Sequence, residues 1–331
     1  MHSPDKQAPP AARQRHGVLV IGEALIDIVK HGEGTQPVEH VGGSPANVAL
    51  ALGRLGHSVR LLTAVGRDTH GARIEKHLSD SGVVVDPRSW TLERTSTACA
   101  TIHQDGAATY DFDITWAVEW PGDPITAGVV HVGSVAAFLP PGAETVHRIV
   151  EQVAHDAIVS FDPNIRPALS GDRLAAIGQV ESIAAMSDIV KLSDEDASWL
   201  YPEWPLDAVA DQLLECGARM IALTAGASGA LLVSSTARVQ VPSPAVKVQD
   251  TVGAGDTFSA GLIDAVLRAP ALLEALNEDA LYTFGCHAAA AAAITVQRAG
   301  ADPPTRQELH RAARAFAVKR SANAAIGLFA C

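Results

Sequence analysis

The sequence predicts an α/β fold in which helices cover both faces of a mostly parallel sheet. Short apolar runs, each typical of a buried strand, recur along the 331 residues at 17–21, 59–65, 129–135, 157–162, 189–192 and 220–224. Helical patterns separate or follow these runs at 46–55, 143–154, 173–186, 208–216, 253–267 and 278–296. Regular alternation of strand and helix is typical of parallel sheets that are covered on both faces.

Two stretches depart from this alternation and predict a second, smaller sheet. Residues 27–41 and 96–113 alternate between apolar and polar side chains, as half-exposed strands do, and Gly106 predicts a turn within the second stretch. Paired with each other, they would stand off the main domain as a lid, with lid segments at about 28–41 and 96–117. The alternative is an ordinary surface hairpin and a loop.

The amino end predicts a tail ahead of a single domain. Residues 1–16 are polar and rich in Pro and Ala, and they lack the apolar core of a signal peptide. We therefore expect a flexible tail at 1–16 and one domain at 17–331.

Composition excludes several classes of protein. The chain is 47% hydrophobic, which argues against disorder, and its net charge of −12 argues against a general nucleic-acid binder. A local basic pocket for an anionic ligand is compatible with this balance. The four cysteines are widely scattered, which fits free thiols in a reducing compartment, and no apolar run reaches the ~18 residues of a membrane span. We expect a soluble, cytoplasmic protein that does not bind membranes.

The strongest chemical signal is the twelve-residue string DTVGAGDTFSAG at 250–261. Gly253, Ala254 and Gly255 come directly before or within the first turn of a predicted helix, where unsatisfied backbone N–H groups can hold a phosphoryl group. Asp256 lies inside that cradle and can accept a proton from an incoming hydroxyl. The alternative is an acidic residue that only stabilises the helix start. No Gly-Lys dipeptide is present, so there is no Walker A loop, and there is no GxGxxG, HExxH or GxSxG motif.

This string resembles the carboxyl-terminal signature of the ribokinase-like (PfkB) carbohydrate kinases. The string GGSPANVALALGRLG at 42–56, continued by VGRD at 65–68, resembles the amino-terminal signature of the same family, and the match covers about residues 17–304. GEALID at 22–27, HVGS at 131–134 and DPNIRP at 162–167 are similar to fructokinase segments. The resemblance implies a doubly wound sheet with a small β lid.

The resemblance also implies ATP-dependent phosphorylation of a primary hydroxyl of a sugar, with fructose as the expected substrate and Mg²⁺ as cofactor. Ribose, 2-keto-3-deoxygluconate or a nucleoside is the nearest alternative substrate. A non-catalytic sugar or nucleotide sensor and a Rossmann oxidoreductase are alternatives from other classes. If two lids covered each other's exposed edges, the protein would be a homodimer.

On the sugar side, Asp27 resembles the family's acceptor for sugar hydroxyls. Gly42 and Gly43 would let the backbone approach the sugar, and the amide of Asn47 would contact it. Taken alone, Asn47 fits a helix cap and Asp27 a strand-end turn equally well. Arg166 follows a predicted strand and is the expected cation near the transferred phosphate or the sugar oxygens.

On the nucleotide side, the expected residues follow three predicted elements. Thr224, Gly226 and Gly229 resemble the segment beside the ATP phosphates. Ser193 and Asp196 occupy the place of the family's Asn-x-x-Glu, so Asp196 would act on magnesium through water, with Glu195 as a stand-in. The Asp250 carboxylate and the Val252 carbonyl match the positions that hold a monovalent cation, for which K⁺ is the candidate.

Overall fold

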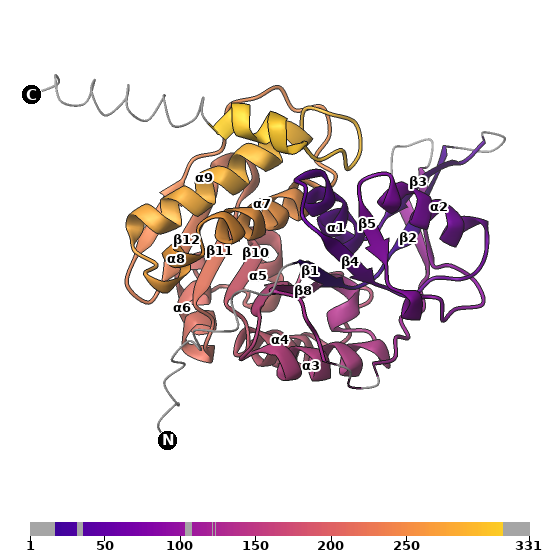
Figure 1. Ribbon diagram of the computed structural model, residues 1–331, viewed down its shortest axis with the longest axis horizontal. Coiled ribbons are helices and arrows are strands. Elements are labelled where there is room, and N and C mark those ends of the chain that lie inside the picture. Colours follow the sequence, from indigo (N-terminus) through magenta and orange to yellow (C-terminus); the bar gives the residue numbers. More distant parts are fainter. Residues whose placement is uncertain (1–16, 32–35, 103–107, 121, 123, 314–331) are drawn as a thin grey trace, which may run out of the picture.

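Two β-sheets organise the protein (Figure 1). The computed structural model describes residues 17–31, 36–102, 108–120, 122 and 124–313, so the expected tail at 1–16 lies outside the described residues. The larger sheet has nine strands. In spatial order they are β13 (Arg238–Val241), β12 (Ala230–Ser234), β11 (Met220–Thr224), β10 (Ile189–Ser193), β9 (Ile158–Asp162), β8 (Val129–Gly133), β1 (Val18–Ile21), β4 (Val59–Leu62) and β5 (Val83–Val85).

The larger sheet is doubly wound, which confirms the expected fold class. The chain starts at β1 in the interior of the sheet, adds β4 and β5 on one side, and then adds β8 and its successors on the other. All neighbours are parallel except β11–β12 and β12–β13. The winding therefore reverses between β1 and β8, and ligands of such sheets bind beyond the carboxyl ends of the strands at that point.

Helices cover both faces of this sheet. The helices include α1 (Ser44–Arg54), α2 (Thr69–Ser79), α3 (Gly142–Val153), α4 (Arg173–Ala184), α5 (Asp194–Leu200), α6 (Leu206–Cys216), α7 (Ala254–Arg268), α8 (Pro270–Glu274) and α9 (Glu278–Thr295). In Figure 1, α7 and α9 lie above the strands, and α3 and α4 lie below them. Buried side chains of α3, α4 and α6 form one core with the sheet, and those of α1, α2, α7 and α9 form the cores on the opposite face.

Side-chain caps explain where several helices begin. The Asp68 carboxylate accepts hydrogen bonds from the Gly71 amide at 2.8 Å and from the Thr95 amide at 2.7 Å. It thereby starts α2 and ties it to the strand that follows Thr95. Asp172 and Asn277 cap α4 and α9 in the same way. These polar residues satisfy amides that a helix leaves without acceptors.

The smaller sheet contains the two stretches that were expected to pair. Its strands, in spatial order, are β3 (Val38–Gly42), β2 (Leu25–His31), β6 (Thr97–Ile102) and β7 (Ala108–Asp113). β2 pairs with β3 and β6 with β7 in antiparallel fashion, and β2 joins the two hairpins by running parallel to β6. Trp116, close to the end of the expected lid segment, is buried in the core of the main domain instead.

Gly43 joins the smaller sheet to α1 at a crowded crossing. Its φ of 101° is one that residues with a side chain rarely adopt. A Cβ atom at this position would lie 2.5 Å from the carbonyl oxygen of Glu23. The segment that enters the small sheet after Glu23 and the segment that leaves it at Gly43 therefore pack directly against each other, and only glycine fits at position 43.

A buried carboxylate fastens α7 to its neighbours. Asp264 on α7 is fully buried and accepts hydrogen bonds from His57 Nε2 at 2.7 Å, His287 Nε2 at 2.6 Å and Arg268 Nε at 2.8 Å. Burial works against its charge, but these hydrogen bonds hold the pKa of Asp264 well below its usual range. His57 follows α1 and His287 lies on α9, so one ionised group connects three helices.

We expect Asp264→Ala to lower the free energy of unfolding by about 3 kcal/mol, because it leaves two largely buried histidines and a half-exposed arginine without their charged acceptor. Urea unfolding followed by circular dichroism measures the change. Lys76→Ala is the control, since Lys76 forms an exposed pair with Asp80 and should lose under about 1 kcal/mol. Equal losses in the two variants would contradict a fastening role for Asp264.

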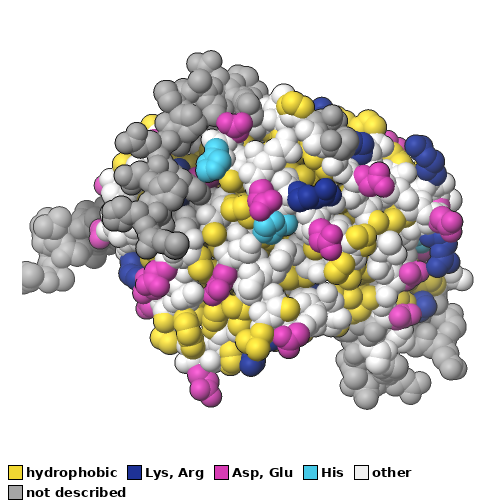
Figure 2. Space-filling view, turned by 90° about the horizontal axis from the view of Figure 1, so that it is seen from below, with side chains coloured by type: hydrophobic (Ala, Val, Ile, Leu, Met, Phe, Trp, Pro, Cys, Tyr) yellow, Lys and Arg dark blue, Asp and Glu magenta, His cyan; other side chains and the backbone are white. Residues whose placement is uncertain are grey.

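On the face seen from below in Figure 1, the Lys and Arg side chains of the described residues do not gather into one continuous basic area (Figure 2). Its hydrophobic side chains form small groups separated by polar atoms, and acidic and basic side chains are interspersed (Figure 2). In the part of the chain that the structure describes, no helix has both the length and the apolar character needed to cross a membrane.

Candidate active site

The start of α7 forms an anion-binding end of a helix. Gly253 caps the helix in the left-handed conformation, with φ of 73°, and a Cβ there would lie 2.7 Å from the Cβ of Ala301. No side chain among the described residues caps this helix, so amides of its first turn lack acceptors. The Ala254 amide is an exception because it donates to the Thr251 carbonyl at 3.2 Å. The amides left for an anion are therefore those of Gly253, Gly255 and Asp256.

Asp256 lies at the third position of α7 and is held by α1. Its Oδ1 accepts a hydrogen bond from Ser44 Oγ at 2.6 Å, and its Oδ2 accepts one from Asn47 Nδ2 at 2.8 Å. Burial raises the pKa of Asp256, although the hydrogen bonds from Ser44 and Asn47 favour the ionised form. The result is a buried carboxylate of fixed orientation. Asn47 is not the cap of α1, which is Gly43, and it lines the cavity with a second N–H and its Oδ1 in addition to the N–H that bonds to Asp256.

A buried ion pair lies beneath the first turn of α7. Lys191 on β10 approaches Asp162 on β9, with Nζ 3.1 Å from Oδ2, and both side chains are almost fully buried. Ser259 on α7 donates to the same Oδ2 at 2.9 Å. A Cβ at Gly255 would lie only 3.0 Å from Lys191 Nζ, so the missing side chain leaves room for the ammonium group beside the cradle.

The charge of Lys191 is secured by its surroundings. Burial disfavours an ammonium ion, but the carboxylates of Asp162, Asp196 and Asp256 outweigh this effect and raise the pKa of Lys191 above its usual value. An ammonium group has three N–H donors, and within the described residues the hydrogen-bond acceptor of the Lys191 ammonium group is Asp162. Lys191 therefore retains donors beside the amides of α7.

A cavity of about 520 Å³ connects these groups along the carboxyl ends of the strands. It runs from the segments after β1 and β8 to those after β9, β10 and β11. The predicted site residues that line it are Asp27, Gly43, Asn47, Arg166, Ser193, Thr224, Gly226, Val252, Gly253, Gly255 and Asp256. Residues from both halves of the chain thus meet where the winding reverses, as expected for this sheet type.

The small sheet supplies one end of the cavity. Asp27 on β2 lines it, and burial raises the pKa of Asp27, although the positive charges of His40 and Arg166 work in the opposite direction. Gly42 does not line the cavity, but a Cβ there would lie 1.9 Å from Asp27 Oδ2. Its role is to make room for that carboxylate. The Arg166 guanidinium bonds to its own loop through Nη1, at 2.8 Å from Asn164 Oδ1, and Arg166 is exposed.

Two of the expected nucleotide-side residues have other roles in the structure. Asp196 does not line the cavity: its Oδ1 accepts from the Ile165 amide at 2.7 Å, and its Oδ2 closes a capping box with Ser193. Asp194 and Glu195 line the cavity instead. Gly229 also does not line the cavity. A Cβ there would lie 2.1 Å from the Val241 carbonyl oxygen. It permits close packing of two strands.

Asp250 connects two loops beside the start of α7. Its Oδ1 accepts from the Val252 amide at 3.0 Å and its Oδ2 from the Gly300 amide at 2.7 Å. These backbone hydrogen bonds lower the pKa of Asp250. The carboxylate is thus ionised, and each oxygen keeps a lone pair for a cation.

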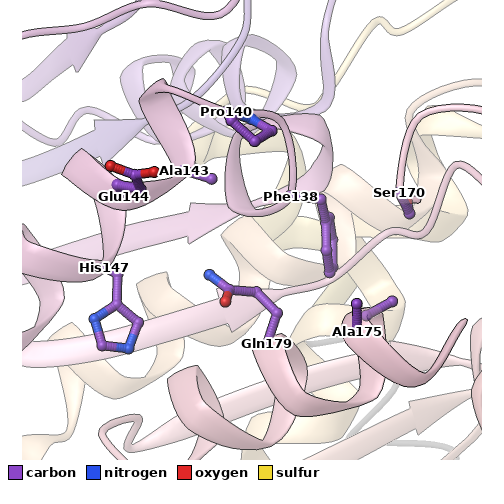
Figure 3. Close-up of a pocket in the computed structure, with 9 residues that line it drawn as sticks. Phe138, Pro140, Ala143, Glu144, His147, Ser170, Ala175 and Gln179 are labelled. Carbon is purple, nitrogen blue, oxygen red and sulfur yellow. The ribbon is translucent and has the colours of Figure 1, made fainter. Parts of the chain in front are cut away.

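A second cavity, of about 380 Å³, lies between α3 and α4 (Figure 3). Glu144 and His147 reach it from α3, Gln179 from α4, and Phe138 forms an apolar wall. No Lys or Arg of the described chain lines this cavity, and His147 Nε2 is hydrogen-bonded to Ser182 Oγ at 2.8 Å. Without a cation or a free helix start, it is a poor site for a phosphorylated ligand.

Comparison with known proteins identifies the family. The family model described as pfkB family carbohydrate kinase matches residues 15–308. The chain belongs to this family. A fructokinase of Rhizobium leguminosarum is 36% identical over 260 residues, which cover 74% of this chain and 78% of the relative. Fructokinase-1 of Zea mays is 31% identical, covering 90% of this chain and 98% of the relative.

A solved structure supports the same assignment. The fructokinase of Xylella fastidiosa with bound ATP has a TM-score of 0.78 to this chain at 26% identity, covering 92% of this chain and 99% of that one. The pfkB-family assignment confirms the resemblance found in the two sequence motifs. It also confirms that the protein is a carbohydrate kinase.

Sequence reasoning missed three residues of this pfkB-family site. Ser44, Lys191 and Glu23 all line the cavity. Ser44 lies within the amino-terminal motif, directly after the Gly42–Gly43 pair, but nothing local shows that its hydroxyl reaches Asp256. Lys191 had a usable signal, because a lysine in an otherwise apolar strand run needs a buried partner.

Proposed function

We propose that this protein transfers the γ-phosphate of ATP to a primary hydroxyl of fructose. The single observation that carries the proposal is the position of Asp256, a fixed and buried carboxylate in the same cavity as Asp27. It lies beside three backbone amides for which the described residues provide no side-chain acceptor. Pure binding of a sugar needs no such carboxylate. The named fructokinases among the relatives supply the choice of sugar.

In this proposal Asp256 is the general base. The sugar hydroxyl oxygen attacks the γ-phosphorus, its proton moves to an Oδ atom of Asp256, and the bond between the γ-phosphorus and the bridging oxygen of ADP breaks. Ser44 and Asn47 keep the carboxylate aimed at the hydroxyl, which matters because positioning supplies most of the rate in phosphoryl transfer.

Fixed positive charge stabilises the transferred group. The amides of Gly253, Gly255 and Asp256 receive its oxygens, and Lys191 adds an ammonium group that is already desolvated, so that no solvent reorganisation is needed during the reaction. Arg166 reaches the same space from the loop after β9. Asp27 accepts hydrogen bonds from sugar hydroxyls at the other end.

The remaining cavity residues fit the expected ions. Asp194 and Glu195 offer carboxylate oxygens, which Mg²⁺ prefers, and they replace Asp196 as the residues that would act on it, directly or through water. Magnesium, when bound with ATP, would neutralise charge on the phosphates. Asp250 and the Val252 carbonyl would hold K⁺ beside the start of α7. Thr224, Ser193 and Gly226 line the path expected for the ATP phosphates.

The small sheet, with segments at about 28–41 and 96–117, would close over the sugar as a lid and exclude water from the reaction. Its strands β3 and β7 are the outer strands of the four-stranded sheet in the part of the chain that the structure describes. A second copy could pair with such an edge, so we also propose a homodimer. Among the described residues, Cys99 and Cys216 are free thiols, which supports a reducing, cytoplasmic location.

A sugar panel tests the proposed substrate. We expect ATP-dependent ADP release with fructose to exceed that with ribose, 2-keto-3-deoxygluconate or a nucleoside by roughly tenfold or more in kcat/KM, as expected where a site is built for particular hydroxyls. A coupled ADP assay measures it. A higher kcat/KM for another substrate would reassign the sugar but leave the kinase intact. Ligand-dependent thermal stabilisation without any product would instead indicate a sensor.

A further inference from the structure

Glu23 is a buried carboxylate that the proposed reaction does not use. It follows β1 in the three-residue link to β2, and its side chain is 4% exposed at the wall of the cavity. Its Oε2 accepts a hydrogen bond from the Ala136 amide at 3.2 Å, and the Ser134 hydroxyl also bonds to it. The link from β1 and the turn after β8 are thus joined at the point where the winding reverses.

The turn that Glu23 holds is strained. Ser134 has φ of 56°, a left-handed conformation that residues with a side chain adopt only when their surroundings enforce it. The preceding residue must be glycine, since a Cβ at Gly133 would lie 1.9 Å from the Asp162 carbonyl oxygen. Ser134 and Val135 line the cavity, so the strained turn forms part of its wall.

Glu23 also lies where the small sheet joins the main domain. Its own carbonyl lies against Gly43, the segment by which the chain returns from the small sheet. Asp27 follows four residues later on β2. The residue whose side chain bonds to the wall turn thus also packs, through its backbone, against the segment that returns from the small sheet, four residues before Asp27.

We propose that Glu23 is a positioning residue for the sugar: its carboxylate locks the strained turn at Ser134 to the base of the small sheet and so sets the distance between the cavity wall and Asp27. This inference rests on the proposed function of the same cavity. Glu23 touches protein groups only and takes no part in the transfer of the phosphoryl group.

The surroundings of Glu23 make the lock sensitive to protons. Burial raises the pKa of Glu23 to about 7, although the hydrogen bonds from Ser134 and Ala136 and the positive charge of Arg166 favour ionisation. Arg166 faces it from the loop after β9, while its hydrogen-bond partners in the turn after β8, Ser134 and Ala136, are uncharged. Other charged groups of the cavity are Asp27, Lys191, Asp194, Glu195 and Asp256. A protonated carboxyl is a weaker acceptor, so acid loosens the lock.

Glu23→Gln tests the proposal, since glutamine keeps the size but carries no charge. We expect the KM for fructose to rise roughly tenfold, the KM for ATP to stay within about twofold and kcat to fall only a few-fold. Asp86→Asn is the matched control, because Asp86 is a similarly buried carboxylate that lines a different cavity. An unchanged fructose KM in Glu23→Gln, or the same rise in Asp86→Asn, would overturn the proposal.

The pH profile separates positioning from simple stabilisation. Because the pKa of Glu23 is raised in the folded protein, its contribution to stability is present at low pH and is lost as the pH rises through about 7. Lowering the pH from about 8 to about 6 should therefore strengthen the fold but raise the wild-type KM for fructose. In Glu23→Gln that rise in KM should disappear. A wild-type rise that persists in the variant would refute the role of Glu23.

Hydrogen exchange without substrate keeps this test independent of the proposed function. The Ala136 amide should exchange roughly tenfold faster in Glu23→Gln than in the wild type, after correction for intrinsic rates. If the wild type phosphorylates no sugar while this difference appears, the proposed function fails and the lock stands. Equal protection of the Ala136 amide in both proteins would show that the lock does not exist.

Discussion

Asp256→Asn should lower kcat roughly 10²–10⁴-fold while the KM for fructose changes only a few-fold. Asparagine can keep one hydrogen bond with Ser44 and fits the same space, but it cannot accept the proton of the attacking hydroxyl. In the native protein, Ser44 Oγ lies 2.6 Å from Oδ1 of Asp256 and Asn47 Nδ2 lies 2.8 Å from its Oδ2. The variant keeps the size of this side chain and should therefore fold normally.

Steady-state kinetics with saturating ATP, combined with the melting temperature, measure this effect. Asp86→Asn is the control, because it changes a buried carboxylate that lies outside this cavity. A turnover of Asp256→Asn within a few-fold of the wild type would remove the general base from the mechanism, and with it the main support for the kinase reaction at this site.

Lys191→Met should lower kcat roughly 10²–10³-fold and also lower the free energy of unfolding by about 3–5 kcal/mol. The loss of turnover follows from removing a fixed, desolvated cation beside the amides of α7. The loss of stability has a different cause, because the buried carboxylate of Asp162 is left without its counter-ion.

A second variant separates these two effects. In Lys191→Met with Asp162→Asn, no unpaired charge is buried, and the asparagine can still accept a hydrogen bond from Ser259. We expect urea unfolding to show most of the lost stability restored, while kcat stays low. Recovery of turnover together with stability would mean that Lys191 only supports the fold and does not act on the phosphoryl group.

The local parts of this site could be predicted from the sequence because short-range chemistry determines them. A glycine before a helix start leaves amides free, and Asp256 lies in the first turn whatever surrounds that turn. The same holds for the main strands, whose apolar runs match β1, β8, β9, β10 and β11 closely. The nucleotide-side prediction for Asp196 does not follow from local chemistry, because a residue three positions after Ser193 can close a capping box as well as face a ligand.

The sequence by itself determined the fold class, the anion-binding start of α7 and the family, since each depends on the order of residues over short distances. The tertiary structure alone decided that Ser44 and Asn47 hold Asp256, that Lys191 lies beneath Gly255, and that Glu23 reaches Ser134. These contacts join residues that are between 64 positions (Lys191 and Gly255) and 212 positions (Ser44 and Asp256) apart in the sequence. Distances of that kind arise from the packing of helices on the sheet, and no local pattern contains them.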